Sequence, residues 1–255
     1  FKEIGKFCKD FNIQNPLIII DSGSTKLPFI SELQNLLSDT KIKSHIYSNI
    51  SPNPRDDEID GGCKAFKDGN HDSIIAIGGG SAMDGGKAIC LTVNSGIPLW
   101  DFEFLDKVPR DLKGKNPFPK LITIPTTAGT GAETEITAMV TDTKKGMKFC
   151  IWHPEARPCL ALVDPELTLK LPANLTAWTG IDAMIHAIEG YSVPMFHPLC
   201  DGSALESLNL ISKSLKLAVN EPDNLVARGG MIVGSYLGGV AFLKGLGLVH
   251  AISHM

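Results

Sequence analysis

A run of apolar residues at positions 73–77 opens directly into three consecutive glycines at positions 78–80. A short, continuously apolar run is typical of a strand that is buried on both faces of a parallel sheet. Two similar runs lie at residues 16–20 and 121–124, and helical apolar spacing occupies the intervals between the runs. This alternation of strand and helix predicts an α/β domain with a mostly parallel sheet.

The remaining patterns place the other expected elements. We expect helices near residues 4–11, 28–37 and 59–66, strands at 45–47 and 159–163, a loop over 100–119 and a hairpin over 140–149. From Pro172 onward the strand patterns stop, and long amphipathic or apolar stretches follow at residues 177–191, 199–219 and 225–242. The sequence therefore predicts an α/β domain over residues 1–171 and the start of an all-helical domain over residues 172–255.

The glycine-rich loop after residues 73–77 contains Gly79, Gly80 and Ser81. Glycines between a strand and a helix let backbone N–H groups approach a phosphate, and the helix dipole favours the negative charge. The loop matches neither GxGxxG nor the P-loop pattern, so a tight turn without a ligand stays open as an alternative. Its place at the carboxyl end of a strand favours ligand binding.

A second polar loop follows the predicted strand at residues 121–124. It contains Thr126, Thr127 and Thr130 together with two glycines. Hydroxyl groups and close backbone approach suit a ribose or a pyrophosphate. Taken alone, a threonine-rich turn is the simpler interpretation.

Asp182 and His186 lie four residues apart in a predicted helix and therefore share one face. Their neighbours are apolar, so both side chains need partners once they are buried. One interpretation is an intrahelical pair that contributes about 0.2–0.5 kcal/mol. The other is half of a metal site, and His250 and His254, also four residues apart, are candidate sources of further ligands.

Composition limits the classes of partner. Lys and Arg total 24 against 28 Asp and Glu, so no basic surplus exists to neutralise nucleic-acid phosphates. No apolar run approaches the length of a membrane span, so we expect no membrane partner. Six scattered cysteines without a CxxC pair predict buried free thiols in a reducing compartment, the cytoplasm.

Four segments together resemble the iron-containing alcohol dehydrogenase family, which shares its fold with glycerol dehydrogenase and dehydroquinate synthase. They are residues 78–87, 125–133, 164–191 and 245–254, in the family's order and spacing. The resemblance implies a Rossmann-like, dinucleotide-binding α/β domain followed by a helical metal-binding domain. Because the chain begins at Phe1 and stops inside a patterned segment, we expect it to be a fragment that is inactive alone.

The resemblance also implies residue roles. Asp182, His186 and His250 are similar to three of the family's four metal ligands, and His254 to a catalytic histidine near the nicotinamide. The fourth ligand, a histidine in the family, is expected beyond Met255. The positions that resemble the family's cofactor-binding residues are Asp21, Asn53, Gly79, Gly80, Ser81, Thr126, Thr127, Thr130, Lys148 and Leu167.

The implied reaction is metal-dependent hydride transfer between a small alcohol or aldehyde and NAD. A carboxylate at Asp21 would accept from a ribose 2′-hydroxyl and repel a 2′-phosphate, which favours NAD over NADP. The resemblance favours Fe²⁺, although Zn²⁺ generally binds such donor sets more tightly. A homodimer or higher homo-oligomer is expected. A zinc glycerol dehydrogenase-like enzyme and a truncated, non-catalytic dinucleotide-binding chain remain the alternatives.

Overall fold

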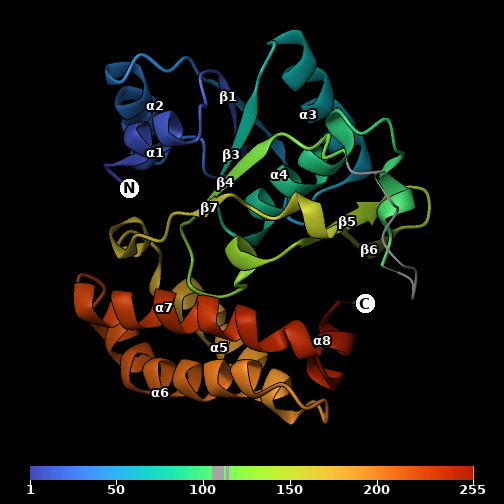
Figure 1. Ribbon diagram of the computed structural model, residues 1–255. Coiled ribbons are helices and arrows are strands. Elements are labelled where there is room, and N and C mark those ends of the chain that lie inside the picture. Colours follow the sequence, from blue (N-terminus) through green and yellow to red (C-terminus); the bar gives the residue numbers. More distant parts are fainter. Residues whose placement is uncertain (105–111, 113–114, 255) are drawn as a thin grey trace. The chain divides into compact units, whose positions relative to one another are not determined.

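The chain forms two compact units, which Figure 1 colours along the sequence. The computed structural model describes residues 1–104, 112 and 115–254. Unit 1 comprises Phe1–Ile124 and Ile136–Leu162, and unit 2 comprises Pro125–Glu135 and Val163–Met255. The predicted loop over 100–119 falls partly on residues outside the described ranges, and a 3-10 helix, η1 (Leu99–Phe102), occupies its start.

Unit 1 is built on a five-stranded sheet in the order β2-β1-β3-β4-β7. Its strands are β1 (Pro16–Asp21), β2 (His45–Ile50), β3 (Ser73–Gly78), β4 (Lys120–Pro125) and β7 (Leu160–Ala161). Strand β1 runs parallel to both β2 and β3, and β4 runs parallel to β7. Every residue of β3 is buried, as the apolar run predicts.

The predicted strand at 159–163 is longer than the observed β7. As an edge strand, β7 pairs with one neighbour, and the regular strand spans only Leu160–Ala161. Backbone hydrogen bonds from Cys159 N–H to Leu121 O (2.8 Å) and from Leu162 N–H to Thr123 O (2.8 Å) nevertheless extend the contact with β4.

Among its described residues, unit 1 also contains four α-helices, and the hairpin β5 (Thr137–Asp142) and β6 (Met147–Trp152) is antiparallel as predicted. The helices are α1 (Ile4–Asp10), α2 (Pro28–Asp39), α3 (Asp56–Asp68) and α4 (Gly80–Val93). Helix α4 packs against β3 so closely that a Cβ at Gly86 would lie 2.6 Å from the Cβ of Ala76. Glycine at position 86 therefore sets how near the helix comes to the sheet.

Unit 2 is helical, in agreement with the predicted all-helical region. Its main helices are α5 (Ala173–Ser192), α6 (Pro198–Asn220), α7 (Leu225–Ala241) and α8 (Leu248–Ser253). The described part of unit 2 also contains the 3-10 helices η2 (Ala132–Thr134) and η4 (Pro165–Thr168), and η5 (Phe242–Lys244) joins α7 to α8. Helices α5, α6 and α7 pack together around a core that includes Ala183, Ile211 and Met231.

The threonine-rich loop belongs to unit 2 and lies directly on α7. Gly131 has a left-handed backbone (φ 65°), and a Cβ there would lie 2.7 Å from the Cα of Gly239. A Cβ at Gly239 would in turn lie 2.9 Å from Gly131 O. Two glycines are therefore needed for this backbone-to-backbone contact.

One helical stretch, Leu225–Lys244, is long and apolar enough to cross a membrane by length and composition alone. The prediction that no segment reaches this length was wrong by that measure. Half of the stretch is buried inside the structure, as expected for the core helix of a soluble protein. Its buried residues include the small Gly234, Gly238 and Ala241 as well as the larger Met231 and Ile232.

All six cysteines are free, as predicted. Cys8, Cys90 and Cys200 are buried, and the other three are partly buried. Burial raises the pKa of the Cys8 thiol to about 12, so it stays protonated and unreactive near neutral pH.

Candidate metal centre

Helices α5 and α8 bring three of the predicted residues together. His186 Nε2 lies 3.9 Å from Asp182 Oδ1, one turn away on α5. His250 Nε2, from α8, lies 3.6 Å from the same oxygen. The potential ligand atoms of the three residues are all within 4.8 Å of one another. The structure therefore assembles the predicted donor set within one unit.

The ring of His186 is held by the threonine-rich loop. Its Nδ1 lies 3.3 Å from Gly129 O, and a carbonyl can only accept, so Nδ1 carries the proton. Burial lowers the pKa of His186 to about 4, against the opposing effect of Asp182. His186 is therefore neutral near pH 7, with the lone pair of Nε2 directed at the candidate site.

His250 lies between two carboxylates. Its Nε2 faces Asp182, and its Nδ1 lies 2.5 Å from Glu189 Oε2. The nearby carboxylate of Asp182 raises the pKa of His250, burial opposes this, and Glu189 adds to the rise. The two imidazole rings of His186 and His250 stack at 4.3 Å with an interplanar angle of 22°.

These donors fit a divalent transition metal. One carboxylate oxygen and two imidazole nitrogens converge, a set that suits Fe²⁺ or Zn²⁺. In each histidine the other ring nitrogen has an acceptor, Gly129 O for His186 and Glu189 for His250. Metal-ligating histidines are usually oriented by such acceptors.

Sequence reasoning gave Glu189 no role, although its spacing was a signal. Asp182, His186 and Glu189 are separated by four and three residues, which places all three on one face of α5. An isolated glutamate in a helix is usually solvated, so the spacing alone was not decisive. The acceptor Gly129 O is a backbone atom, and no sequence pattern identifies it.

His254 caps the C-terminal end of α8 and is exposed. Its ring lies 5.8 Å from that of His250 in an edge-on orientation. The predicted catalytic histidine is therefore next to the donor set and in contact with solvent.

In unit 1, the glycine-rich loop joins β3 to α4. Gly79 is the N-cap of α4, and Gly80 and Ser81 form its first turn. A Cβ at Gly78 would lie 3.2 Å from Asp21 Oδ2, so the carboxylate that ends β1 is beside this loop. Asp21 accepts hydrogen bonds from Gly23 N–H (3.0 Å) and Ser24 Oγ (2.6 Å).

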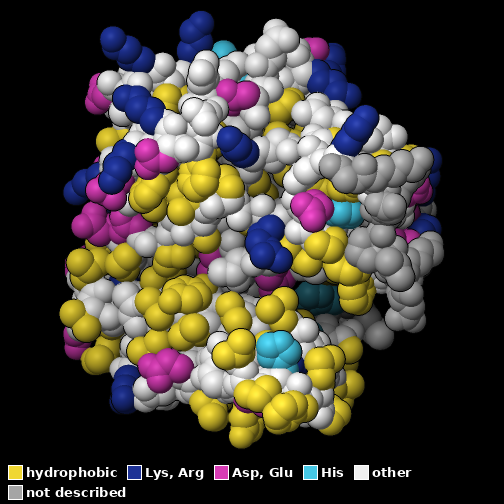
Figure 2. Space-filling view, viewed as in Figure 1, with side chains coloured by type: hydrophobic (Ala, Val, Ile, Leu, Met, Phe, Trp, Pro, Cys, Tyr) yellow, Lys and Arg dark blue, Asp and Glu magenta, His cyan; other side chains and the backbone are white. Residues whose placement is uncertain are grey.

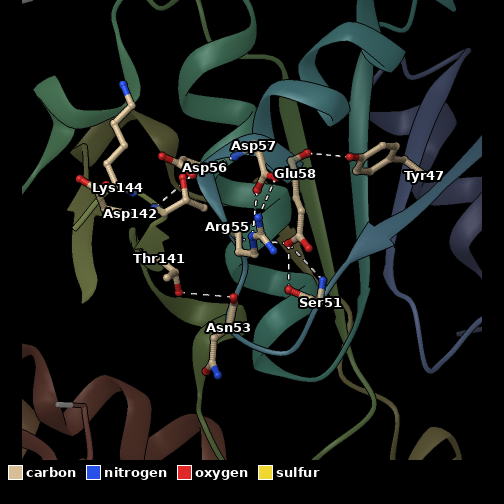
Figure 3. Close-up of polar contacts among 11 residues, drawn as sticks. Tyr47, Ser51, Asn53, Arg55, Asp56, Asp57, Glu58, Thr141, Asp142 and Lys144 are labelled. Atoms are coloured by element: carbon tan, nitrogen blue, oxygen red, sulfur yellow. Dashed lines mark hydrogen bonds and ion pairs between the residues drawn. The ribbon is translucent and has the colours of Figure 1, made fainter. Parts of the chain in front are cut away.

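Asn53 also lies at this loop, because its N–H donates to Ser81 Oγ at 3.4 Å. Figure 3 shows the polar contacts that hold its turn. Thr141 Oγ1 donates to Asn53 O (3.5 Å), and the N–H groups of Ser51 (3.2 Å) and Arg55 (3.0 Å) donate to the Glu58 carboxylate. The structure thus gathers Asp21, Asn53 and the glycine loop at the carboxyl edge of the sheet.

Lys148 lies on β6, opposite Thr141 on β5. Burial raises the pKa of Asp84 in α4 to about 6, and the positive charges of Lys87 and Lys148 oppose that rise. The charge of Lys148 therefore acts on Asp84 in α4, the helix that follows the glycine loop.

The remaining predicted cofactor residues belong to unit 2. Thr126 is buried, Thr127 is partly buried, and Thr130 Oγ1 accepts from Ala132 N–H at 3.3 Å. Leu167 is buried in η4. A Cβ at Gly129 would lie 2.7 Å from the Cβ of Thr179, so this loop is packed against α5 as well as α7.

An α/β unit with a glycine loop and a helical unit with a carboxylate and two oriented histidines define a two-part protein with a candidate metal centre. The chain belongs to the iron-containing alcohol dehydrogenase family. The family model described as iron-containing alcohol dehydrogenase matches residues 1–165, and the C-terminal model of the same family matches residues 176–255. The predicted family is confirmed.

Related proteins of known function share this assignment. The chain is 35% identical to an NAD-dependent methanol dehydrogenase of Bacillus methanolicus over 99% of its own length and 65% of that protein. It is 36% identical to alcohol dehydrogenase 4 of Schizosaccharomyces pombe, over 99% of the chain and 58% of that protein. The chain therefore spans about three fifths of the length of these relatives.

Solved structures confirm the predicted fold. A crystal structure of 1,3-propanediol oxidoreductase superposes with a TM-score of 0.93 at 32% identity, covering 99% of this chain and 65% of that one. Sulfoacetaldehyde reductase from Bifidobacterium kashiwanohense, solved in complex with NAD⁺, has a TM-score of 0.86 at 32% identity and covers the same shares.

Proposed function

We propose that the protein is a metal-dependent alcohol dehydrogenase that transfers a hydride between a small alcohol or aldehyde and NAD. The observation that carries this proposal is the convergence of Asp182, His186 and His250 within 4.8 Å. Family membership and the names of the relatives, which include methanol and alcohol dehydrogenases, support it.

In this proposal Asp182, His186 and His250 hold Fe²⁺, with Zn²⁺ as the alternative metal. When bound, such a metal supplies Lewis acidity to the substrate oxygen, and NAD supplies the hydride acceptor. Asp182 supplies a carboxylate oxygen to this site, and His186 supplies the lone pair of a neutral imidazole. His254, exposed beside His250, moves a proton between the site and solvent.

Each unit carries residues that we assign to the dinucleotide. In unit 1, Gly79, Gly80 and Ser81 hold the pyrophosphate at the N-terminus of α4, where backbone N–H groups and the helix dipole favour an anion. Asp21 and Asn53, also in unit 1, face the adenosine side, and Lys148 is a further cofactor residue of this unit. In unit 2, the assigned cofactor residues are Thr126, Thr127, Thr130 and Leu167. A relative solved with NAD⁺ supports the choice of dinucleotide.

In the proposed functional division, residues 1–171 form the dinucleotide-binding domain, and residues 172–255 contribute to the helical metal-binding domain. This division differs from the two compact units, because Pro125–Glu135 and residues 163–171 belong to unit 2. We place the enzyme in the cytoplasm as a homodimer or higher homo-oligomer, with small alcohols or aldehydes as substrates.

A reconstitution experiment tests the proposal. The full-length protein is stripped of metal, reloaded anaerobically with Fe²⁺ or with Zn²⁺, and assayed for NADH formation with methanol, ethanol, 1,3-propanediol and glycerol. We expect alcohol-dependent NADH formation only after reloading, and higher with Fe²⁺. Faster turnover with Zn²⁺ and glycerol would select the zinc enzyme, and no turnover with any pair would contradict the proposal.

A further inference from the structure

Glu189 is a buried carboxylate that the proposed ligand set does not use. It lies on α5 three residues after His186 and is 8% exposed. Burying a carboxylate without partners is costly. Both of its oxygens are engaged, since Oε1 accepts from Val249 N–H at 2.7 Å and Oε2 faces His250 Nδ1 at 2.5 Å.

The position of Glu189 fixes where the proton of His250 lies. Its Oε2 faces His250 Nδ1 at 2.5 Å, and its Oε1 accepts from Val249 N–H. A carboxylate placed in this way accepts a hydrogen bond from the ring nitrogen. His250 must donate from Nδ1, which leaves Nε2 as the nitrogen that faces Asp182.

Glu189 also holds the start of α8. The first N–H groups of a helix have no partner within the helix, and a negative charge there is favourable. The carboxylate reaches from α5 to one of these groups, that of Val249. Helix α8 is only six residues long, so its attachment to α5 depends strongly on contacts of this kind.

Gly247 makes room for the carboxylate. A Cβ at this position would lie 2.8 Å from Glu189 Oε1 and 3.1 Å from Cδ. The backbone of Gly247 has a negative φ (−110°), so the limit on a side chain here is steric and comes from Glu189.

We propose that Glu189 is a positioning residue of the metal centre: it anchors α8 to α5 and keeps the proton of His250 on Nδ1, so that Nε2 is free to bind the metal. This inference rests on the proposed metal site. The two histidines differ in this respect, because His186 is oriented by a backbone carbonyl that no side-chain substitution removes.

Glu189→Gln separates the two tasks. The amide oxygen of glutamine can still accept from Val249 N–H, which retains the anchor for α8. The amide NH₂ then faces His250 Nδ1, which favours the tautomer that carries its proton on Nε2 and cannot bind a metal through that atom. We expect metal affinity to fall about 10–100-fold, the usual effect of losing an outer partner of a ligand.

The measurement is titration of the metal-free, full-length protein with Zn²⁺ and with Co²⁺, the latter followed by its visible absorption. Thermal unfolding of the metal-free protein is recorded in parallel and should stay near that of the wild type. Glu206→Gln, an exposed glutamate on α6, is the matched control and should change neither the affinity nor the Co²⁺ spectrum.

Gly247→Ala gives an independent test, and it also serves if Glu189→Gln does not fold. Its Cβ pushes the carboxylate away from His250, so it should weaken metal binding in the same direction. Gly202→Ala is its control, because nothing lies within 4 Å of a Cβ at that position. Wild-type affinity in either test variant overturns the positioning role. A wild-type protein that binds neither metal contradicts the proposed function instead.

Discussion

The two units differ in the contacts that stabilise each of them internally. In unit 1, the exposed large apolar side chains among the described residues are Leu27, Phe104 and Met147. Unit 2 leaves many such side chains in solvent, and Phe196 and Val226 are each 87% exposed. Figure 2 shows apolar side chains gathered over the surface of this helical unit. Unit 1 therefore buries most of its large apolar side chains, whereas unit 2 adds buried polar contacts to its apolar core.

Those contacts in unit 2 are polar and buried. Arg228 is 2% exposed, and its guanidinium donates to Thr176 Oγ1 (2.8 Å), Pro222 O (3.0 Å) and Leu171 O (3.4 Å). Lys244 pairs with Asp201. The comparison teaches that stability and metal binding can be perturbed separately. Substitutions in the sheet should lower stability alone, and substitutions of the buried polar groups of unit 2 should reach the metal centre.

The largest expected effect on metal binding is that of His186→Ala. Structural zinc sites bind with about 10–16 kcal/mol in total, so one of four ligands accounts for roughly 3 kcal/mol, or more than about a 100-fold loss of affinity. Metal titration measures the loss of affinity, and alcohol-dependent NADH formation measures the accompanying loss of activity. His45→Ala, an exposed histidine in unit 1, is the control, and equal losses in the two variants would contradict the ligand assignment.

Ile75→Ala tests the sheet core of unit 1. Ile75 is fully buried in β3, next to Ile18 in β1, so the truncation should cost about 2–5 kcal/mol of unfolding free energy. Denaturant unfolding measures the loss, and Met147→Ala, at an exposed position, should be nearly neutral. A parallel loss of metal affinity in the folded protein would break the separation between the units.

Arg228→Met tests the polar anchor of unit 2. The substitution keeps an unbranched side chain but removes three charge-assisted hydrogen bonds, for an expected loss of about 2–3 kcal/mol. Arg55→Met is the matched control, because Arg55 forms an exposed ion pair with Asp57 at 2.9 Å and such pairs contribute about 0–1 kcal/mol. Equal losses in denaturant unfolding would show that burial does not distinguish the two arginines.

Asp21→Asn tests the dinucleotide edge of unit 1. Asparagine retains an acceptor for Gly23 N–H but removes the charge that repels a 2′-phosphate. We expect KM for NADP to fall about tenfold, roughly 1.4 kcal/mol, with the metal content unchanged. An unchanged ratio of NAD to NADP turnover would show that Asp21 does not select the cofactor.

The smallest effect concerns His71 in unit 1. Burial lowers its pKa, against a hydrogen bond to Asn15 O at 2.9 Å. As pH falls below about 6.5, the unfolded chain takes up a proton that the folded chain resists, so the wild type loses stability. Between pH 7 and pH 5, His71→Gln should lose less unfolding free energy than the wild type does. The difference between the two losses should be below about 1 kcal/mol, measured on metal-free protein. A steeper loss in the variant would reverse the expected sign.

Much of the fold was predictable because apolar periodicity is local. The runs at residues 16–20 and 73–77 became β1 and β3, and the stretch at 199–219 became α6. Strand β7 was predicted too long because edge pairing depends on partners that the run itself does not reveal. The apolar length of residues 225–244 was underestimated because Arg228 and several glycines interrupt the apolar run, although the mean hydropathy of the stretch stays high.

The candidate site was predictable only in part. The spacing of Asp182 and His186 identified them as a pair, but nothing local connects them with His250, more than sixty residues later. The spacing of His250 and His254 made them candidate ligands, and only the family resemblance assigned His250 to the same site as Asp182 and His186. The acceptors that orient the histidines, Gly129 O and Glu189, depend on how the threonine-rich loop and α8 pack against α5.

The hydrogen bond from His186 to Gly129 O has a practical consequence for engineering. Gly129 lies in Pro125–Glu135, the loop that also carries the proposed cofactor residues Thr126, Thr127 and Thr130 and is therefore a natural target for cofactor redesign. A loop transplanted from a relative carries its own backbone path, and with it the position of the carbonyl that orients His186. Cofactor redesign in this scaffold is therefore also metal-site redesign, and chimaeras should be screened for metal content before they are screened for turnover.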